Sequence, residues 1–197
     1  MSAQTLHDIA AVLAIIALLG AVSLVIARLI PSVATVRYLD LVYRLQLPLA
    51  ALVAVATTLG SLTFSEHYGW IPCRFCWYQR TMMFPLAVIL LIAAVRKDRN
   101  IKWYATAVAT IGILLSGWHN LLERGAVAES KECAATTPCA VPNLISFGGR
   151  DEITLRPTGF PSVTLAVMAF AAFAAIIALL LLPEPLEEEE DGQPSAG

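Results

Sequence analysis

The sequence predicts an all-α integral membrane protein, and two observations support this prediction. Of the 197 residues, 58% are hydrophobic and only 14% are charged, which is more apolar surface than one small soluble domain can bury. Five apolar stretches each approach the roughly 20 residues that a helix needs to cross a bilayer, and inside hydrocarbon a helix satisfies its own backbone hydrogen bonds. The predicted spans are residues 9–30, 45–65, 77–95, 103–122 and 159–182.

The first predicted helix, residues 9–30, is interpreted as a retained span. Met1 to Asp8 carries no Lys or Arg, and the apolar run is too long for a signal peptide. Pro48 lies in the second predicted helix and Pro85 in the third. Neighbouring helices in a membrane bundle satisfy the carbonyls that proline leaves free, so these prolines predict kinks rather than breaks.

A long segment, residues 123–158, separates the fourth predicted helix from the fifth. Loops of this length between packed helices are uncommon unless they have a function. Its prolines and glycines predict mostly irregular structure. After the fifth helix, residues 183–197 are rich in glutamate beside glycine and proline, a composition that predicts a disordered acidic tail.

The basic residues predict the orientation of the helices. Cytoplasmic loops retain Lys and Arg during membrane insertion. Two short basic loops are therefore expected in the cytoplasm, which places the N-terminus and residues 66–76 and 123–158 outside. All four cysteines fall in these outer segments, where a bacterial-type inner membrane faces an oxidising compartment. The basic residues of the two loops are Arg28, Arg37, Arg44, Arg96, Lys97, Arg99 and Lys102.

The first cysteine pair is a CxxC motif, Cys73 and Cys76, where an outer loop meets the third predicted helix. The unpaired amides and the dipole of a helix N-terminus favour the reactive thiolate over the thiol. Arg80 follows Cys76 by one helical turn, so its charge is expected to favour the thiolate further. The alternative is that Arg80 extends toward lipid headgroups.

The second pair, Cys133 and Cys139, lies in the long outer segment. Closing so small a ring stabilises the chain by only roughly 2 to 2.5 kcal/mol on the chain-entropy model, which suits a bond that exchanges. The alternative is a static structural disulfide that holds the loop together. A zinc site is disfavoured because neither pair belongs to the paired CxxC knuckles of a zinc ribbon, and Trp77 stands where a c-type haem motif requires His. No metal is therefore expected.

The residues around the CxxC motif closely resemble the signature of the disulfide bond formation protein B (DsbB) family. The matching run is PCRFCWYQR at residues 72–80, followed by Met82, Met83 and Pro85. The order of the pairs also resembles this family, because the vitamin K epoxide reductase relatives place the loop pair before the CxxC. The short spacing from Cys133 to Cys139 is similar to the family's compact branch, often found in Gram-positive bacteria.

This resemblance implies a four-helix transmembrane bundle core over residues 45–182. The chain departs from that plan by an additional N-terminal transmembrane helix, which with a cytoplasmic loop makes up residues 1–44. Residues 183–197 would then be a cytoplasmic tail. The protein is expected in the bacterial inner membrane, with its cysteines on the extracytoplasmic face.

The resemblance also implies a function, because family members are quinone reductases that reoxidise a thioredoxin-like, DsbA-like thiol oxidase. The partner's thiolate would attack the Cys133–Cys139 disulfide, most readily at Cys133, and the loop thiols would then reduce Cys73–Cys76. Cys76 would pass the electrons to ubiquinone or menaquinone, each transfer being a two-electron exchange whose direction is set by relative potentials.

Two further residues are expected near the quinone. The resemblance places Arg80 beside the quinone ring. His119, near the outer end of the fourth predicted helix, would either hydrogen-bond a quinone carbonyl or cap a contact between helices. Two other functions stay open: a noncatalytic scaffold or receptor with two structural disulfides, and a conduit carrying reducing electrons outward, which the lack of an inner-face cysteine disfavours.

Overall fold

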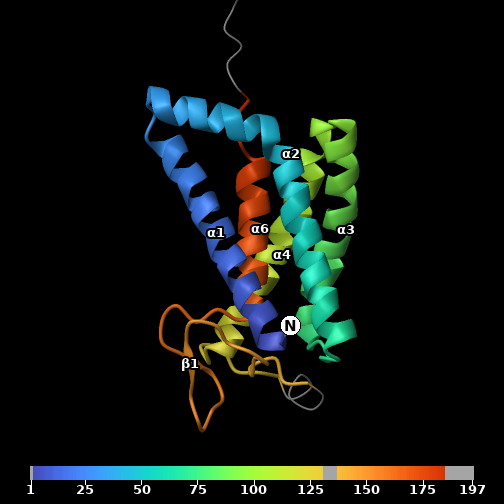
Figure 1. Ribbon diagram of the computed structural model, residues 1–197, viewed down its shortest axis with the longest axis vertical. Helices are drawn as coiled ribbons and strands as arrows, with labels where there is room; N and C mark the ends of the chain where they lie inside the picture. The colour runs from blue at the N-terminus through green and yellow to red at the C-terminus, as the bar shows by residue number, and fades with distance from the viewer. Residues whose placement is uncertain (1, 131–136, 185–197) are drawn as a thin grey trace, which may run out of the picture.

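The computed structural model describes residues 2–130 and 137–184 of the chain. Within these residues, five long helices pack side by side as a bundle, and the irregular segment between α4 and α6 covers one end of it (Figure 1). The all-α membrane fold is confirmed, and the chain is a multi-pass membrane protein. The five helices are α1 (Ala3–Leu29), α2 (Val33–Leu62), α3 (Arg74–Arg96), α4 (Lys102–Glu123) and α6 (Leu165–Leu180).

Short elements extend or connect these helices. A π-helical turn, η1 (Thr63–His67), continues α2, and a 3-10 turn, η2 (Arg99–Ile101), precedes α4. Two short strands, β1 (Gly149–Arg150) and β2 (Pro157–Thr158), pair antiparallel within the irregular segment. With these extensions, α1, α2, α3 and α4 are each long and apolar enough to cross a membrane.

Residues 33–44, predicted as a loop, are instead the first turns of α2. Ser32 and Thr35 form a capping box that starts the helix, and Arg44 pairs with Asp40 one turn away at 3.0 Å. Because this stretch contains charged residues, it was not predicted as part of an apolar helix. Figure 1 shows α2 first crossing the end of the bundle and then turning along it, and Pro48 inside the helix supplies the kink.

The fifth helix was predicted to start at residue 159, which is wrong by six residues. Val163 and Ser146 exchange both backbone hydrogen bonds at 2.9 Å, which holds the chain extended before the helix. Thr164 then caps α6 by accepting a hydrogen bond from Val167. The helix has 16 residues, about 24 Å at 1.5 Å per residue, and is the most buried of the bundle.

Small residues let α4 approach α6 closely. Ala105 and Ala109 are fully buried, and Gly112 lies against the ring of Phe173. Lipid provides no hydrophobic driving force for association between membrane helices, so close van der Waals packing of this kind holds them together. The buried side chains of α2, α3, α4 and α6 thereby form one core cluster.

The start of α1 is tied to the irregular segment by a buried polar contact. The Ser146 hydroxyl donates to the Asp8 carboxylate at 2.6 Å, so His7 Nδ1 donates to the Ser146 oxygen at 2.7 Å. His7 is fully buried and its ring meets Phe64 edge-on. We call this contact of His7, Asp8 and Ser146 the α1 clasp.

The bundle has two chemically different ends. The start of α1, the end of α2, the start of α3, the end of α4 and the irregular segment gather at one end, which we call the cysteine end (Figure 1). The loops from α1 to α2 and from α3 to α4 lie at the other, basic end. The described cysteines therefore share one end of the bundle, as the sequence predicted.

Candidate functional site

Cys73 and Cys76 form a disulfide at the N-terminus of α3. Cys73 is the N-cap residue, and its sulfur accepts a hydrogen bond from the Cys76 amide at 3.1 Å. Cys73 is buried and Cys76 half-buried, with Cα atoms 5.0 Å apart. The predicted position of the motif at a helix N-terminus is confirmed, so the first-turn amides face any anion formed on the Cys73 sulfur.

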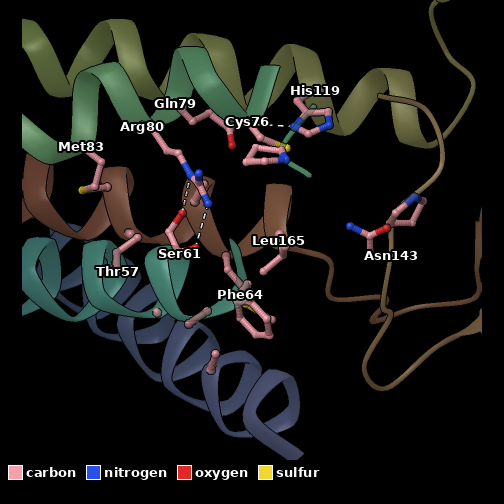
Figure 2. A pocket seen from close by; sticks show the side chains of 18 of the residues that line it. Thr57, Ser61, Phe64, Cys76, Gln79, Arg80, Met83, His119, Asn143 and Leu165 are labelled. Atoms are coloured by element: carbon pink, nitrogen blue, oxygen red, sulfur yellow. Dashed lines mark hydrogen bonds between the residues drawn. The ribbon is translucent and has the colours of Figure 1, made fainter. Parts of the chain in front are cut away.

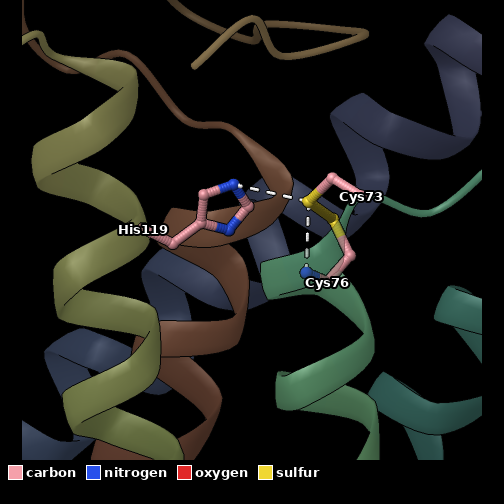
Figure 3. A group of neighbouring side chains, drawn as sticks. All are labelled: Cys73, Cys76 and His119. Carbon is pink, nitrogen blue, oxygen red and sulfur yellow. Dashed lines mark hydrogen bonds between the residues drawn. A yellow bond between two sulfur atoms is a disulfide. The ribbon is translucent and has the colours of Figure 1, made fainter. Parts of the chain in front are cut away.

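His119 of α4 lies directly against this disulfide (Figure 3). Its Nε2 is 3.7 Å from the Cys73 sulfur, and its ring stacks on Phe75 with centroids 5.8 Å apart. The Gln79 side-chain amide donates to Nδ1 at 3.1 Å. Because Nδ1 accepts this bond, the proton of the neutral ring is on Nε2, facing the sulfur. His119 therefore joins α3 to α4 at the disulfide itself.

Cys139 returns from the irregular segment to the same place. Its side chain is buried and packs with Cys73 and Leu122. Its carbonyl accepts from His119 Nε2 at 3.1 Å, and its amide donates to the Glu129 carboxylate. Cys133, the other member of the predicted loop pair, lies outside the described residues. The structure thus brings one loop cysteine to the CxxC disulfide.

 In sequence, Cys139 follows Cys76 by 63 residues, so the folded bundle is what brings the two together.

Arg80 points into the bundle, one turn after Cys76 on α3 (Figure 2). Its Nε donates to the Ser61 hydroxyl at 2.9 Å, and its Nη2 donates to the Ser61 carbonyl at 2.8 Å. The guanidinium also lies 5.3 Å from the centroid of the Trp77 ring. Arg80 is 8% exposed, so the alternative that it extends toward lipid headgroups is wrong.

A cavity of about 510 Å³ opens beside the disulfide, within the range typical of small-molecule sites. Its walls come from α1, α2, α3, α4, α6 and the irregular segment, and most of its lining is apolar. Figure 2 shows Arg80, Gln79, Cys76 and His119 along one side of it. An apolar cavity with a few polar groups at one end suits a largely apolar ligand with a polar head.

Several polar residues of this site were not predicted from the sequence. Ser61, which holds Arg80, gave no signal, because the two residues are 19 positions apart in sequence and lie on different helices. Glu123 is buried in the last turn of α4 and accepts a hydrogen bond from the Thr164 hydroxyl at 2.6 Å. Its spacing of one helical turn after His119 was the signal that could have found it, because residues four apart share a helix face.

Three of these side chains are of types that also bind metal ions. The ligand atoms of Cys73, Cys76 and His119 all lie within 4.8 Å of one another. The two sulfurs are bonded to each other, however, and a metal is bound by thiolates. The donor set of the oxidised site therefore does not fit a metal ion.

Comparison with known families identifies the chain. The sequence profile described as "Disulfide bond formation protein DsbB" matches residues 43–182. The chain belongs to this DsbB family. The family resemblance predicted from the CxxC region is confirmed, and membership supports an oxidoreductase role in disulfide bond formation. The matched range begins within α2, so α1 lies outside the part that defines the family.

Curated relatives agree with this assignment. The chain is 40% identical to a "Probable disulfide formation protein" of Deinococcus radiodurans over 138 residues, which are 70% of this chain and 88% of the relative. It is 35% identical to "Disulfide bond formation protein C" of Bacillus subtilis, over 66% of this chain and 86% of the relative. A "Probable disulfide formation protein C 2" of Bacillus anthracis is 31% identical, over 73% and 94%. No solved structure matches the chain.

Proposed function

We propose that the chain is a thiol:quinone oxidoreductase that reoxidises a thioredoxin-fold, DsbA-like thiol oxidase and so drives disulfide bond formation. One observation carries this proposal. The Cys73–Cys76 disulfide borders an apolar cavity of about 510 Å³ on one side and contacts the segment that carries Cys139 on the other. Electrons entering at the loop cysteines thus have a short path to a ligand in the membrane.

The relay begins at the loop pair. A thiolate of the reduced partner attacks the Cys133–Cys139 disulfide at Cys133, and the second partner thiol resolves the mixed disulfide, which leaves two loop thiols. The 2% exposure of Cys139 supports attack at Cys133, because an incoming protein has little access to the buried sulfur. Each step exchanges one disulfide for two thiols and moves two electrons.

The loop thiols next reduce the CxxC disulfide. Cys139 packs against Cys73, which supports attack on the Cys73 sulfur with Cys76 as the leaving thiolate. His119 Nε2–H and the Cys76 amide both face the Cys73 sulfur, so they stabilise negative charge on the CxxC pair. Cys76 lines the cavity and is the sulfur that passes the electrons on.

The residues around the cavity fit a quinone. Ser61 holds two N–H groups of Arg80, so the remaining N–H groups of this guanidinium are oriented to donate to a quinone carbonyl. Apolar side chains from α1 and α2, among them Leu13, Ile16 and Leu52, provide surface for an isoprenoid chain. When bound, ubiquinone or menaquinone accepts two electrons and two protons.

The two ends of the bundle support a location in the bacterial inner membrane with the cysteines outside. The basic end carries the short loops rich in Lys and Arg, which stay in the cytoplasm during insertion. The cysteine end then faces the extracytoplasmic space, where disulfides persist and a thiol oxidase works.

The test measures oxidation of a reduced thioredoxin-fold oxidase by the purified protein with ubiquinone or menaquinone. Each cysteine is replaced by Ser in turn, with Ala128→Ser on the exposed outer segment as the matched control. We expect each cysteine variant to abolish turnover, and Cys76→Ser to abolish quinone reduction even with a chemical thiol as donor. Normal partner turnover by Cys133→Ser would refute the relay order. Disulfides that stay oxidised throughout turnover would favour the noncatalytic scaffold.

A further inference from the structure

Glu123 is a buried carboxyl group that the proposed relay does not use. It is 3% exposed, and among the described residues it is the one carboxylate that lines the cavity. Burying a carboxyl group is costly unless it is hydrogen-bonded or paired. A buried carboxyl group beside a redox disulfide is therefore a candidate for a chemical role.

Two contacts aim this carboxyl group at the site. The Thr164 hydroxyl at the start of α6 donates to Oε2 at 2.6 Å. The other oxygen, Oε1, lies 3.9 Å from His119 Nε2, and the same nitrogen is 3.7 Å from the Cys73 sulfur. The carboxyl oxygen and the sulfur thus both lie within 4 Å of the same His119 nitrogen.

His119 is unsuited to accept a proton in this arrangement. Its Nδ1 lone pair is taken by the Gln79 amide, and its Nε2 already carries the proton that the Cys139 carbonyl accepts. A neutral imidazole has one lone-pair nitrogen, so no base on this ring faces the sulfurs. Glu123 is the neighbouring group that can accept a proton, because its Oε2 accepts one hydrogen bond and its Oε1 lies near His119.

We propose that Glu123 accepts a proton when the loop thiols reduce Cys73–Cys76, and so keeps the charge of the buried site constant. This inference rests on the proposed function. Two loop S–H bonds break, one loop S–S bond forms, and the Cys73–Cys76 bond breaks with the electron pair. One released proton stays on one sulfur of the CxxC pair as a thiol, and the other moves to the Glu123 carboxylate while the second sulfur of the pair remains a thiolate.

The charges and protons balance in this scheme. Before the step, the site holds one negative charge on Glu123; afterwards, it holds one on the CxxC pair. The remaining thiol and the protonated Glu123 together store two protons, the number that a two-electron reduction of a quinone consumes. Moving a charge within the site avoids placing a second one in a low-dielectric environment, which would be costly.

Other charged or titratable groups near Glu123 also affect its pH dependence. On its own helix, His119 lies one turn before it and Arg124 directly after it. The element α6 contributes Thr164, which does not titrate in this range. The ionisable or charged groups of α3 and the irregular segment that share the cavity wall are Cys73, Cys76, Arg80 and Cys139.

The test compares wild type with Glu123→Gln in the full-length protein without quinone. Thiol trapping followed by mass spectrometry gives the reduction potential of Cys73–Cys76 separately from the loop pair, at a series of pH values. We expect wild type to take up two protons per two electrons near neutral pH and Glu123→Gln to take up one. Glu123→Asp, which keeps a carboxyl group, should retain the two-proton slope, and the exposed Glu152→Gln is the matched control.

Turnover with quinone in the same preparations separates the two proposals. We expect Glu123→Gln to be slower than wild type by about tenfold or more, as for loss of a proton-transfer group. Equal pH slopes in wild type and Glu123→Gln would overturn the role of Glu123 and leave the quinone reductase function intact. Wild-type protein that fails to reduce quinone would overturn the proposed function, whatever the slopes.

Discussion

Replacing Ser146 by Ala should loosen α1 from the rest of the bundle. The substitution removes the oxygen that accepts the hydrogen bond of the fully buried His7 Nδ1. A buried donor left without a partner costs about 1–3 kcal/mol. At 1.4 kcal/mol for each factor of ten, the population with α1 undocked should rise about 5-fold to 150-fold. Because α1 lines the cavity, undocking would also remove part of its wall.

Hydrogen exchange in detergent or nanodiscs measures this change. We expect faster exchange of the amides in the first turns of α1 in Ser146→Ala, with little change in α3 and α4. The double variant His7→Leu with Ser146→Ala should recover most of the lost protection, because removing both buried partners leaves no unpaired donor. Unchanged exchange in Ser146→Ala, or additive losses in the double variant, would refute the clasp as the tie between α1 and the loop.

Two further predictions concern the bundle core and the cavity. Arg80→Lys should lower kcat/KM for quinone by about tenfold, roughly 1.4 kcal/mol, because lysine cannot reproduce the two-point contact with Ser61 that orients the guanidinium; unchanged steady-state kinetics would contradict this. Gly112→Ala should lower thermal stability by about 1–3 kcal/mol, because its Cβ would overlap the Phe173 ring. Gly117→Ala, whose Cβ meets the Phe170 ring no closer than 3.8 Å, is the control, and equal melting temperatures of the two variants would contradict the packing argument.

The sequence by itself determined the class of protein and the place of the first redox pair. Long apolar runs require helices because lipid offers backbone groups no hydrogen-bond partners. Cys73 and Cys76 precede such a run, so their position at the N-terminus of α3 follows from local order alone. The family was visible for the same reason, since its signature lies within one short segment.

The tertiary structure decided how the site is assembled. Arg80 meets Ser61, His119 meets Cys139, and Glu123 meets Thr164 through contacts between separate elements of the bundle. Such contacts depend on helix rotation and on the path of the irregular segment, and neither has a local pattern in the chain. The start of α6 shows the same limit, because the predicted span begins at residue 159 and pairing of Val163 with Ser146 is what delays the helix. Local composition sets which segments enter the membrane, whereas packing between distant segments sets which polar groups meet inside it.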